Sequence, residues 1–76
     1  MEQAYVLVQT QVGRSAEVSA ALAAISGVVL AEDVTGPYDV IARVEAATSG
    51  ELGRLVQQKV QQVDGITRTV TCAVVA

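Results

Sequence analysis

Apolar residues recur along this chain with two periods, one typical of strands and one typical of helices. β-branched and aromatic residues dominate segments 3–12, 28–35, 38–46 and 66–75, and we predict these as four strands. A helix is predicted over residues 16–25 and a longer one between Thr48 and Gly65, because apolar residues recur there every three or four positions. The two apolar stripes are Val18, Ala21, Leu22 and Ile25, then Leu52, Leu55, Val56, Lys59 (through its stem), Val60 and Val63.

Residues that favour helix ends and turns mark the same boundaries. Ser15 is placed to cap the first helix, and Thr48 with Glu51 has the form of a capping box before the second. Gly27 and Gly65 are expected to end the two helices in a left-handed conformation. Gly36-Pro37 predicts a turn between the second and third strands.

The predicted order of elements is β-α-β-β-α-β, which we assign to one domain over residues 1–76. Two β-α-β halves of this kind interleave most simply as a four-stranded antiparallel sheet with both helices on one face. The predicted fold class is therefore α+β, ferredoxin-like.

The predicted sheet is apolar on both faces. Ala4, Val6 and Val8 of the first strand point one way, while Tyr5 and Leu7 point the other. In the fourth strand Ile66, Val70, Cys72 and Val74 lie on one side, and Ala73 and Val75 join Thr67, Thr69 and Thr71 on the other. Two short helices cover one face only. We therefore expect the other face to pack on a second copy as a homodimer, with free strand edges for larger assemblies; the alternative is a solvated, half-apolar face.

Size and composition favour self-association, rather than a disulfide or a bound metal, as the means of stabilising the fold. A chain of 76 residues is marginal as a monomer, and one cysteine with no histidine permits neither an internal disulfide nor an ordinary zinc site, so no cofactor is expected. The net charge of -3 and the scattered basic residues argue against direct nucleic acid binding. Apolar runs are too short for a membrane span, and no signal peptide is visible, which predicts a cytoplasmic protein.

Catalytic chemistry has little support in these residues. Cys72 is interpreted as a small buried hydrophobe, and Gly13-Arg14-Ser15 as an ordinary helix start rather than an anion site. The segment 35–39 differs, because Asp39 could hold an ammonium group while free backbone N–H groups near Gly36 take a carboxylate. An ordinary hairpin turn, in which Asp39 satisfies nearby backbone donors, is the alternative.

These segments resemble the effector-binding (RAM) domain of the Lrp/AsnC family of transcriptional regulators. The matching segments are AYVLV, ISGVVLAEDVTGPYDVIARV, the EL-x-x-LV helix and VDGITRTVT, and the G-x-Y-D turn at Gly36–Asp39 is the most specific of them. Regulators of this family carry a helix-turn-helix domain ahead of this one, for which the first few residues leave no room. The chain therefore looks like a stand-alone version, without direct DNA binding.

The resemblance also implies a ligand and partners. It implies dimers that pack through their sheets and join into octamers or decamers, with an amino acid or related molecule bound where dimers meet. Carried over to this sequence, the site comprises Thr35, Gly36, Tyr38 and Asp39, with Thr69 and Thr71 as weaker candidates. A full-length Lrp/AsnC regulator could be a partner through mixed oligomers.

Two other interpretations remain open. A small dimeric α+β-barrel enzyme of monooxygenase or isomerase type shares the fold outline, but usually has His, Asn or Trp in a cavity between sheet and helices, and this chain has none of these. The domain could also be purely structural, with an empty ligand site.

Overall fold

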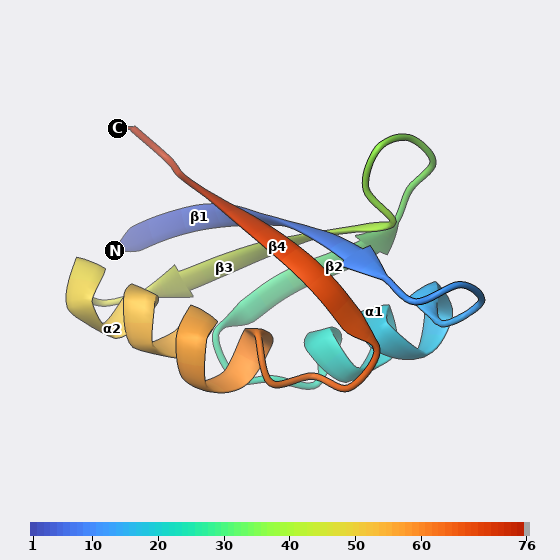
Figure 1. Cartoon of the computed structure of the whole chain (residues 1–76). Coiled ribbons are helices and arrows are strands. Elements are labelled where there is room, and N and C mark those ends of the chain that lie inside the picture. Colours follow the sequence, from blue (N-terminus) through green and yellow to red (C-terminus); the bar gives the residue numbers. More distant parts are fainter. Residues whose placement is uncertain (76) are drawn as a thin grey trace.

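The computed structural model describes residues 1–75 and has the predicted order of elements (Figure 1). The strands pair in the order β2-β3-β1-β4, and every pairing is antiparallel. The ferredoxin-like prediction is therefore confirmed. The elements are β1 (Glu2–Thr10), α1 (Ser15–Ala23), β2 (Val28–Asp33), β3 (Val40–Ala46), α2 (Ser49–Leu55), the π-helical segment η1 (Val56–Val60) and β4 (Ile66–Ala73).

Both helices lie on one side of the sheet, and the core fills the space between the two layers (Figure 1). Alternate residues of the inner strands β1 and β3 point toward the helices, as the predicted parity of β1 requires. The buried residues are Ala4, Val6, Val8, Val18, Leu22, Val40, Ala42, Val44, Leu52, Val56 and Val60. Ala21 was predicted to join the helical stripe, but it is exposed. The fully buried residues of α1 are Val18 and Leu22. None of the helices in residues 1–75 has the length and apolar character that a membrane crossing requires.

The two helix starts differ from each other. Thr48 Oγ1 accepts a hydrogen bond from the backbone N–H of Glu51 at 3.1 Å, so the predicted cap of α2 is confirmed. The predicted cap of α1 is wrong. Ser15 is the first helical residue, and Arg14 occupies the cap position without a side-chain cap bond. Gly27 and Gly65 have φ of 99° and 98°, as predicted for glycines that follow helices.

Replacing Thr48 by alanine should lower the free energy of unfolding by about 1 kcal/mol, the usual effect of losing a threonine cap. Urea unfolding of both proteins at one protein concentration measures the difference. Ser15→Ala is the matched control, because the Ser15 hydroxyl caps nothing; a larger loss in the Ser15 variant would contradict the assignment of the caps.

The face of the sheet away from the helices, called the open face, is uncovered in the single chain. The strand register places on it Gln3, Tyr5, Leu7, Gln9, Leu30, Glu32, Ile41, Arg43, Glu45, Arg68, Val70 and Cys72. Leu7 lies directly between Ile41 and Val70 on the neighbouring strands. Tyr5 and Leu30 are 42% and 45% exposed. Cys72 is also exposed, so its interpretation as a buried hydrophobe is wrong for a single copy; it lies on the open face of an outer strand.

The outer strands carry irregularities that sequence parity missed. The register with β1 skips one residue near the start of β4, so that Ile66 packs against the core although Val70 and Cys72 lie on the open face. A similar shift interrupts β2 between Val28 and Leu30. Bulges of this kind hinder edge-to-edge pairing of strands, and so favour association through the open face.

Candidate functional site

The loop between β2 and β3, residues 34–39, is closed at its base by a hydrogen bond from Val34 N–H to the Asp39 carbonyl at 2.9 Å. It rises from the end of the sheet on the side away from the helices (Figure 1). Gly36 has φ of 143°, a conformation that side chains disfavour, and nothing lies within 4 Å of the position a Cβ would occupy. The backbone at the tip of this loop is therefore open to close approach by another molecule.

Asp39 fastens the loop to the end of β1. Its Oδ2 accepts hydrogen bonds from Thr10 N–H at 2.8 Å and from Thr10 Oγ1 at 3.3 Å, and its own N–H donates to the Val8 carbonyl. Gln9 Nε2 adds a bond of 3.0 Å to the Pro37 carbonyl. The ordinary-turn role of Asp39 is thus real for one carboxylate oxygen. Within residues 1–75, Oδ1 accepts no hydrogen bond.

Several polar groups of the loop have no intramolecular partner. The hydroxyls of Thr35 and Tyr38 form no hydrogen bond with the described residues, and neither do the backbone N–H groups of Gly36 and Tyr38. Thr35 and Gly36 are exposed, while Tyr38 and Asp39 are partly buried. Asp39 and Arg43 do not form an ion pair; Arg43 instead binds Gln3 on β1. The turn therefore gathers four of the six predicted site residues. It offers free hydrogen-bond donors, the hydroxyls and backbone N–H groups, and a free acceptor, the second carboxylate oxygen of Asp39.

Thr69 and Thr71 lie elsewhere in the single chain. They are opposite Val8 and Val6, and so face the helix side of the sheet, away from the projecting loop. Thr69 Oγ1 accepts a hydrogen bond from Gln61 Nε2 at 3.2 Å. Thr71 lines an open groove of about 350 Å³ between β4 and the second helix, together with Leu52, Val56, Gln57 and Gln61. One copy thus separates these threonines from the turn.

The π-helical segment explains how Gln61 reaches β4. Its hydrogen bond from Gln61 N–H to the Val56 carbonyl, at 2.8 Å, spans one residue more than an α-helical bond. Sequence reasoning missed Gln61, because regular helical spacing contains no sign of the extra residue. It also missed Thr10 as the partner of Asp39, since 29 residues separate the two.

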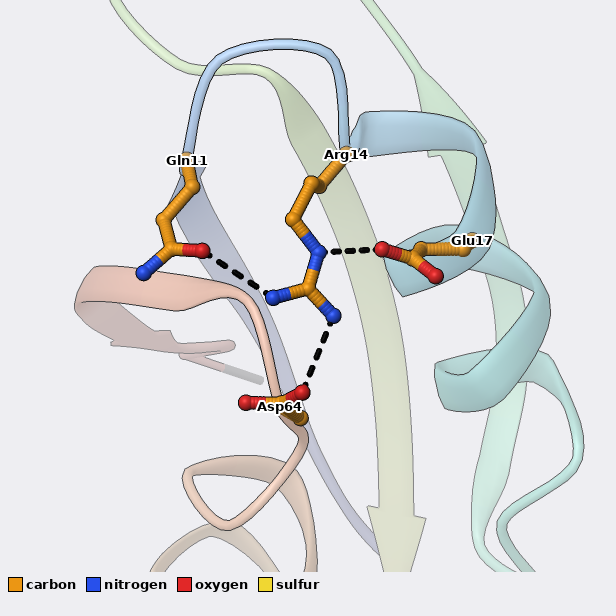
Figure 2. Close-up of polar contacts among 4 residues, drawn as sticks. All are labelled: Gln11, Arg14, Glu17 and Asp64. Atoms are coloured by element: carbon orange, nitrogen blue, oxygen red, sulfur yellow. Dashed lines mark hydrogen bonds and ion pairs between the residues drawn. The ribbon is translucent and has the colours of Figure 1, made fainter.

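A polar cluster braces the same end of the sheet (Figure 2). The Arg14 guanidinium donates to Gln11 Oε1 and Asp64 Oδ2, both at 3.0 Å, and to Glu17 Oε1. Hydrogen bonds to the Glu17 and Asp64 carboxylates raise the pKa of Arg14, which stays charged at any pH of interest. A hydrogen bond from Gln11 N–H to the Gly65 carbonyl, at 2.8 Å, joins the same two loops. These contacts therefore join the β1–α1 loop to the loop before β4.

Other sites offer less chemistry. A shallow groove of about 510 Å³ lies between the end of α1 and the second helix, lined by Ile25, Leu55 and the charged Glu51, Arg54 and Lys59. Within residues 1–75, no three cysteine or acidic side chains come together as metal ligands would. The structure thus defines a class of protein: a ferredoxin-like domain with one covered sheet face and unpartnered polar groups at one hairpin turn.

The chain belongs to the Lrp/AsnC ligand binding domain family, whose model matches residues 3–76. Over 55 residues it is 36% identical to an uncharacterized HTH-type transcriptional regulator of Pyrococcus furiosus, a match that covers 72% of this chain and 37% of the regulator. The chain thus spans just over a third of the length of this relative. The family and the relative's name point to a regulatory rather than a catalytic role.

Solved structures share the whole fold. A hypothetical protein from Pyrococcus horikoshii and a protein from Thermus thermophilus each have a TM-score of 0.92 and 32% identity, over 100% of this chain and 92% and 95% of theirs. A more distant neighbour, 16% identical with a TM-score of 0.83 over 99% of this chain and 50% of its own, is a transcriptional regulator of Neisseria meningitidis solved as a complex with L-Met. That last likeness shows the fold alone.

Proposed function

We propose that this chain is a ligand-responsive regulatory module. Copies assemble through their open faces, and an amino acid or related molecule binds beside the β2–β3 turn where assembled copies meet. The observation that carries this proposal is the turn itself, which presents free hydroxyls, free N–H groups and a free carboxylate oxygen and is fastened to β1 by hydrogen bonds of Asp39.

The groups at the turn match both ends of an amino acid. An ammonium group can donate to Asp39 Oδ1, and a carboxylate can accept hydrogen bonds from the backbone N–H groups of Gly36 and Tyr38. The open space above Gly36 lets such a ligand reach the backbone. An amino acid ligand is also consistent with the L-Met bound by the Neisseria regulator. Thr69 and Thr71 stay secondary candidates, which would contribute from a neighbouring copy.

Assembly is supported by the apolar centre of the open face. Leu7, Ile41 and Val70 form a row across three strands with Tyr5 beside it, and a monomer rarely exposes such a patch. A two-fold axis that joins two open faces buries all of these residues. Octamers or decamers then need further contacts between dimers, and in this proposal the projecting turns supply them.

The regulatory role would be indirect. The described elements all belong to the ligand-binding domain, so these residues would act on DNA through a helix-turn-helix domain to which they are coupled, for example that of a full-length relative in mixed oligomers in the cytoplasm. In this proposal the chain has no catalytic role of its own.

A panel of amino acids tests ligand binding by thermal shift, with oligomer mass followed by sedimentation. A ligand at about 100 times its dissociation constant should stabilise the protein by about 2.7 kcal/mol, a visible rise in melting temperature. If the whole panel leaves both the melting temperature and the mass unchanged, the sensor role is wrong.

In this proposal the exposed Thr35 hydroxyl also donates a hydrogen bond to the ligand carboxylate. Replacing Thr35 by valine should therefore weaken binding of the amino acid found in this way by about tenfold, the loss of one hydrogen bond to a charged group. The fold should be unaffected, because the Thr35 hydroxyl has no partner in the described chain. Calorimetric titration gives the dissociation constants. Thr67→Val is the control, since Thr67 is also exposed but lies on the outer strand β4, which β1 separates from the strand that follows the turn; equal affinities for the wild type and the Thr35 variant would place the ligand elsewhere.

A further inference from the structure

Arg43 occupies an unusual position for a charged residue, near the middle of the open face. Its cross-strand neighbours are Tyr5 on β1 and Leu30 on β2. Its Nη2 donates to Gln3 Oε1 at 2.9 Å, but its Nε is buried and has no hydrogen-bond partner among the described residues. The ion pairs found in residues 1–75 both belong to Arg14, so no carboxylate neutralises Arg43 within the described chain. A buried, unpartnered guanidinium N–H is costly, and usually has its partner outside the chain considered.

The charges of the open face are balanced. Two positive residues, Arg43 and Arg68, share it with two negative ones, Glu32 and Glu45. Glu45 Oε2 accepts a hydrogen bond from Gln3 Nε2 at 3.1 Å, which places it in the same network as Arg43. Glu32 is exposed, and its carboxylate accepts no hydrogen bond from residues 1–75. A face with an equal number of each charge around an apolar centre suits a second copy of itself.

We propose that Arg43 pairs with Glu32 of a second copy when two open faces pack, and that this ion pair sets the register of the dimer. The inference rests on the assembly part of the proposed function. Packing two faces removes the remaining water from Arg43, which is unfavourable unless a carboxylate replaces it. Two-fold symmetry forms the pair twice. Leu7 and its apolar neighbours would supply affinity, while the two ion pairs select one relative placement of the sheets.

Charge reversal gives a sharp test. Arg43→Glu puts a second carboxylate against Glu32 of the other copy, and Glu32→Arg puts two guanidinium groups together, so each variant alone should dimerise at least about 100-fold more weakly than the wild type. Mixed in equal amounts, the two variants should form a heterodimer in which both contacts join opposite charges. Native mass spectrometry separates heterodimer from homodimers, because the two variants differ in mass.

Two controls make each outcome decisive. Arg43→Glu mixed with Glu45→Arg should give much less heterodimer than the first mixture, because one of its two contacts still joins two carboxylates; more heterodimer in this mixture than in the first would overturn the assignment to Glu32. The wild type is measured first, and if it is monomeric the assembly proposal itself fails. If the wild type is dimeric but the two charge-reversed variants form no heterodimer on mixing, the ion pair alone is refuted.

Should a reversed variant fail to fold, as judged by circular dichroism, the neutral variants Arg43→Gln and Glu32→Gln decide the question. Their effects on the dimer dissociation constant should be coupled at least about tenfold in a double-mutant cycle. Additive effects would refute the pair.

Discussion

Leu7→Lys is expected to convert the assembled protein into monomers. Leu7 lies at the centre of the open face, directly between Ile41 on β3 and Val70 on β4. In a face-to-face dimer its lysine replacement would place an unpaired ammonium group in an apolar interface, which costs several kcal/mol. The dimer dissociation constant should therefore rise about 100-fold or more, since each 1.4 kcal/mol is a factor of ten.

Sedimentation equilibrium measures this change as a fall in mass to the 7.9 kDa of a single chain. Gln58→Lys, which introduces the same charge at an exposed position of η1 on the helix side, should leave the oligomer intact. The melting temperature of the Leu7 variant should also fall and lose its dependence on protein concentration, because association no longer adds to stability. An unchanged mass for the Leu7 variant would mean that copies associate through another surface, or not at all.

The fold could be predicted because local signals agree with one another. Strand parity, helical spacing and the glycines after each helix all depend on neighbouring residues, and each was sufficient for its own element. The predictions were wrong where a contact with a residue distant in the sequence determines the local structure. Segment 3–12 looks like one long strand, yet β1 ends at Thr10, because Gln11 bonds to Gly65 and Val12 is left fully exposed.

The outer strand β4 shows the same limit. From Thr69 to Cys72 its alternation of threonines and apolar residues correctly separates two sides, but Ile66 lies on the opposite side from Val70, and the pattern cannot say which side faces the helices. Thr69 and Thr71 face them, and Thr71 lines the open groove between β4 and the second helix. The skipped residue near Ile66 likewise depends on pairing with β1, and has no local signal.

The candidate site was predictable in part for a similar reason. Residues 35–39 are contiguous, so the turn and its polar groups are visible in the sequence alone. The bonds from Thr10 to Asp39 and from Gln9 to Pro37 join distant segments, and only the sheet brings them together. Asp39 therefore has two roles, since one oxygen holds the loop and the other is free. Asp39→Ala would disturb the loop as well as any bound ligand, which is why Thr35 is the better test of binding.

The second large effect is expected for Leu22→Ala, which should lower the free energy of unfolding by about 2 to 5 kcal/mol, as for other buried leucines. Leu22 is completely buried, and α1 contributes only one other fully buried side chain, Val18, to the core. A domain of this size has a total stability of roughly 4 to 11 kcal/mol, so the variant should lose a large fraction of it.

Urea unfolding followed by circular dichroism measures the loss, with both proteins at one concentration because association contributes to apparent stability. Val12→Ala is the matched control: Val12 is fully exposed in the loop after β1, so its truncation should change stability by less than about 0.5 kcal/mol. Similar losses in the two variants would show that α1 does not pack on the sheet through Leu22. A large loss in the Leu22 variant and not in the control would instead show that α1 packs on the sheet through Leu22, which with Val18 forms the fully buried part of a helix otherwise rich in alanine and serine.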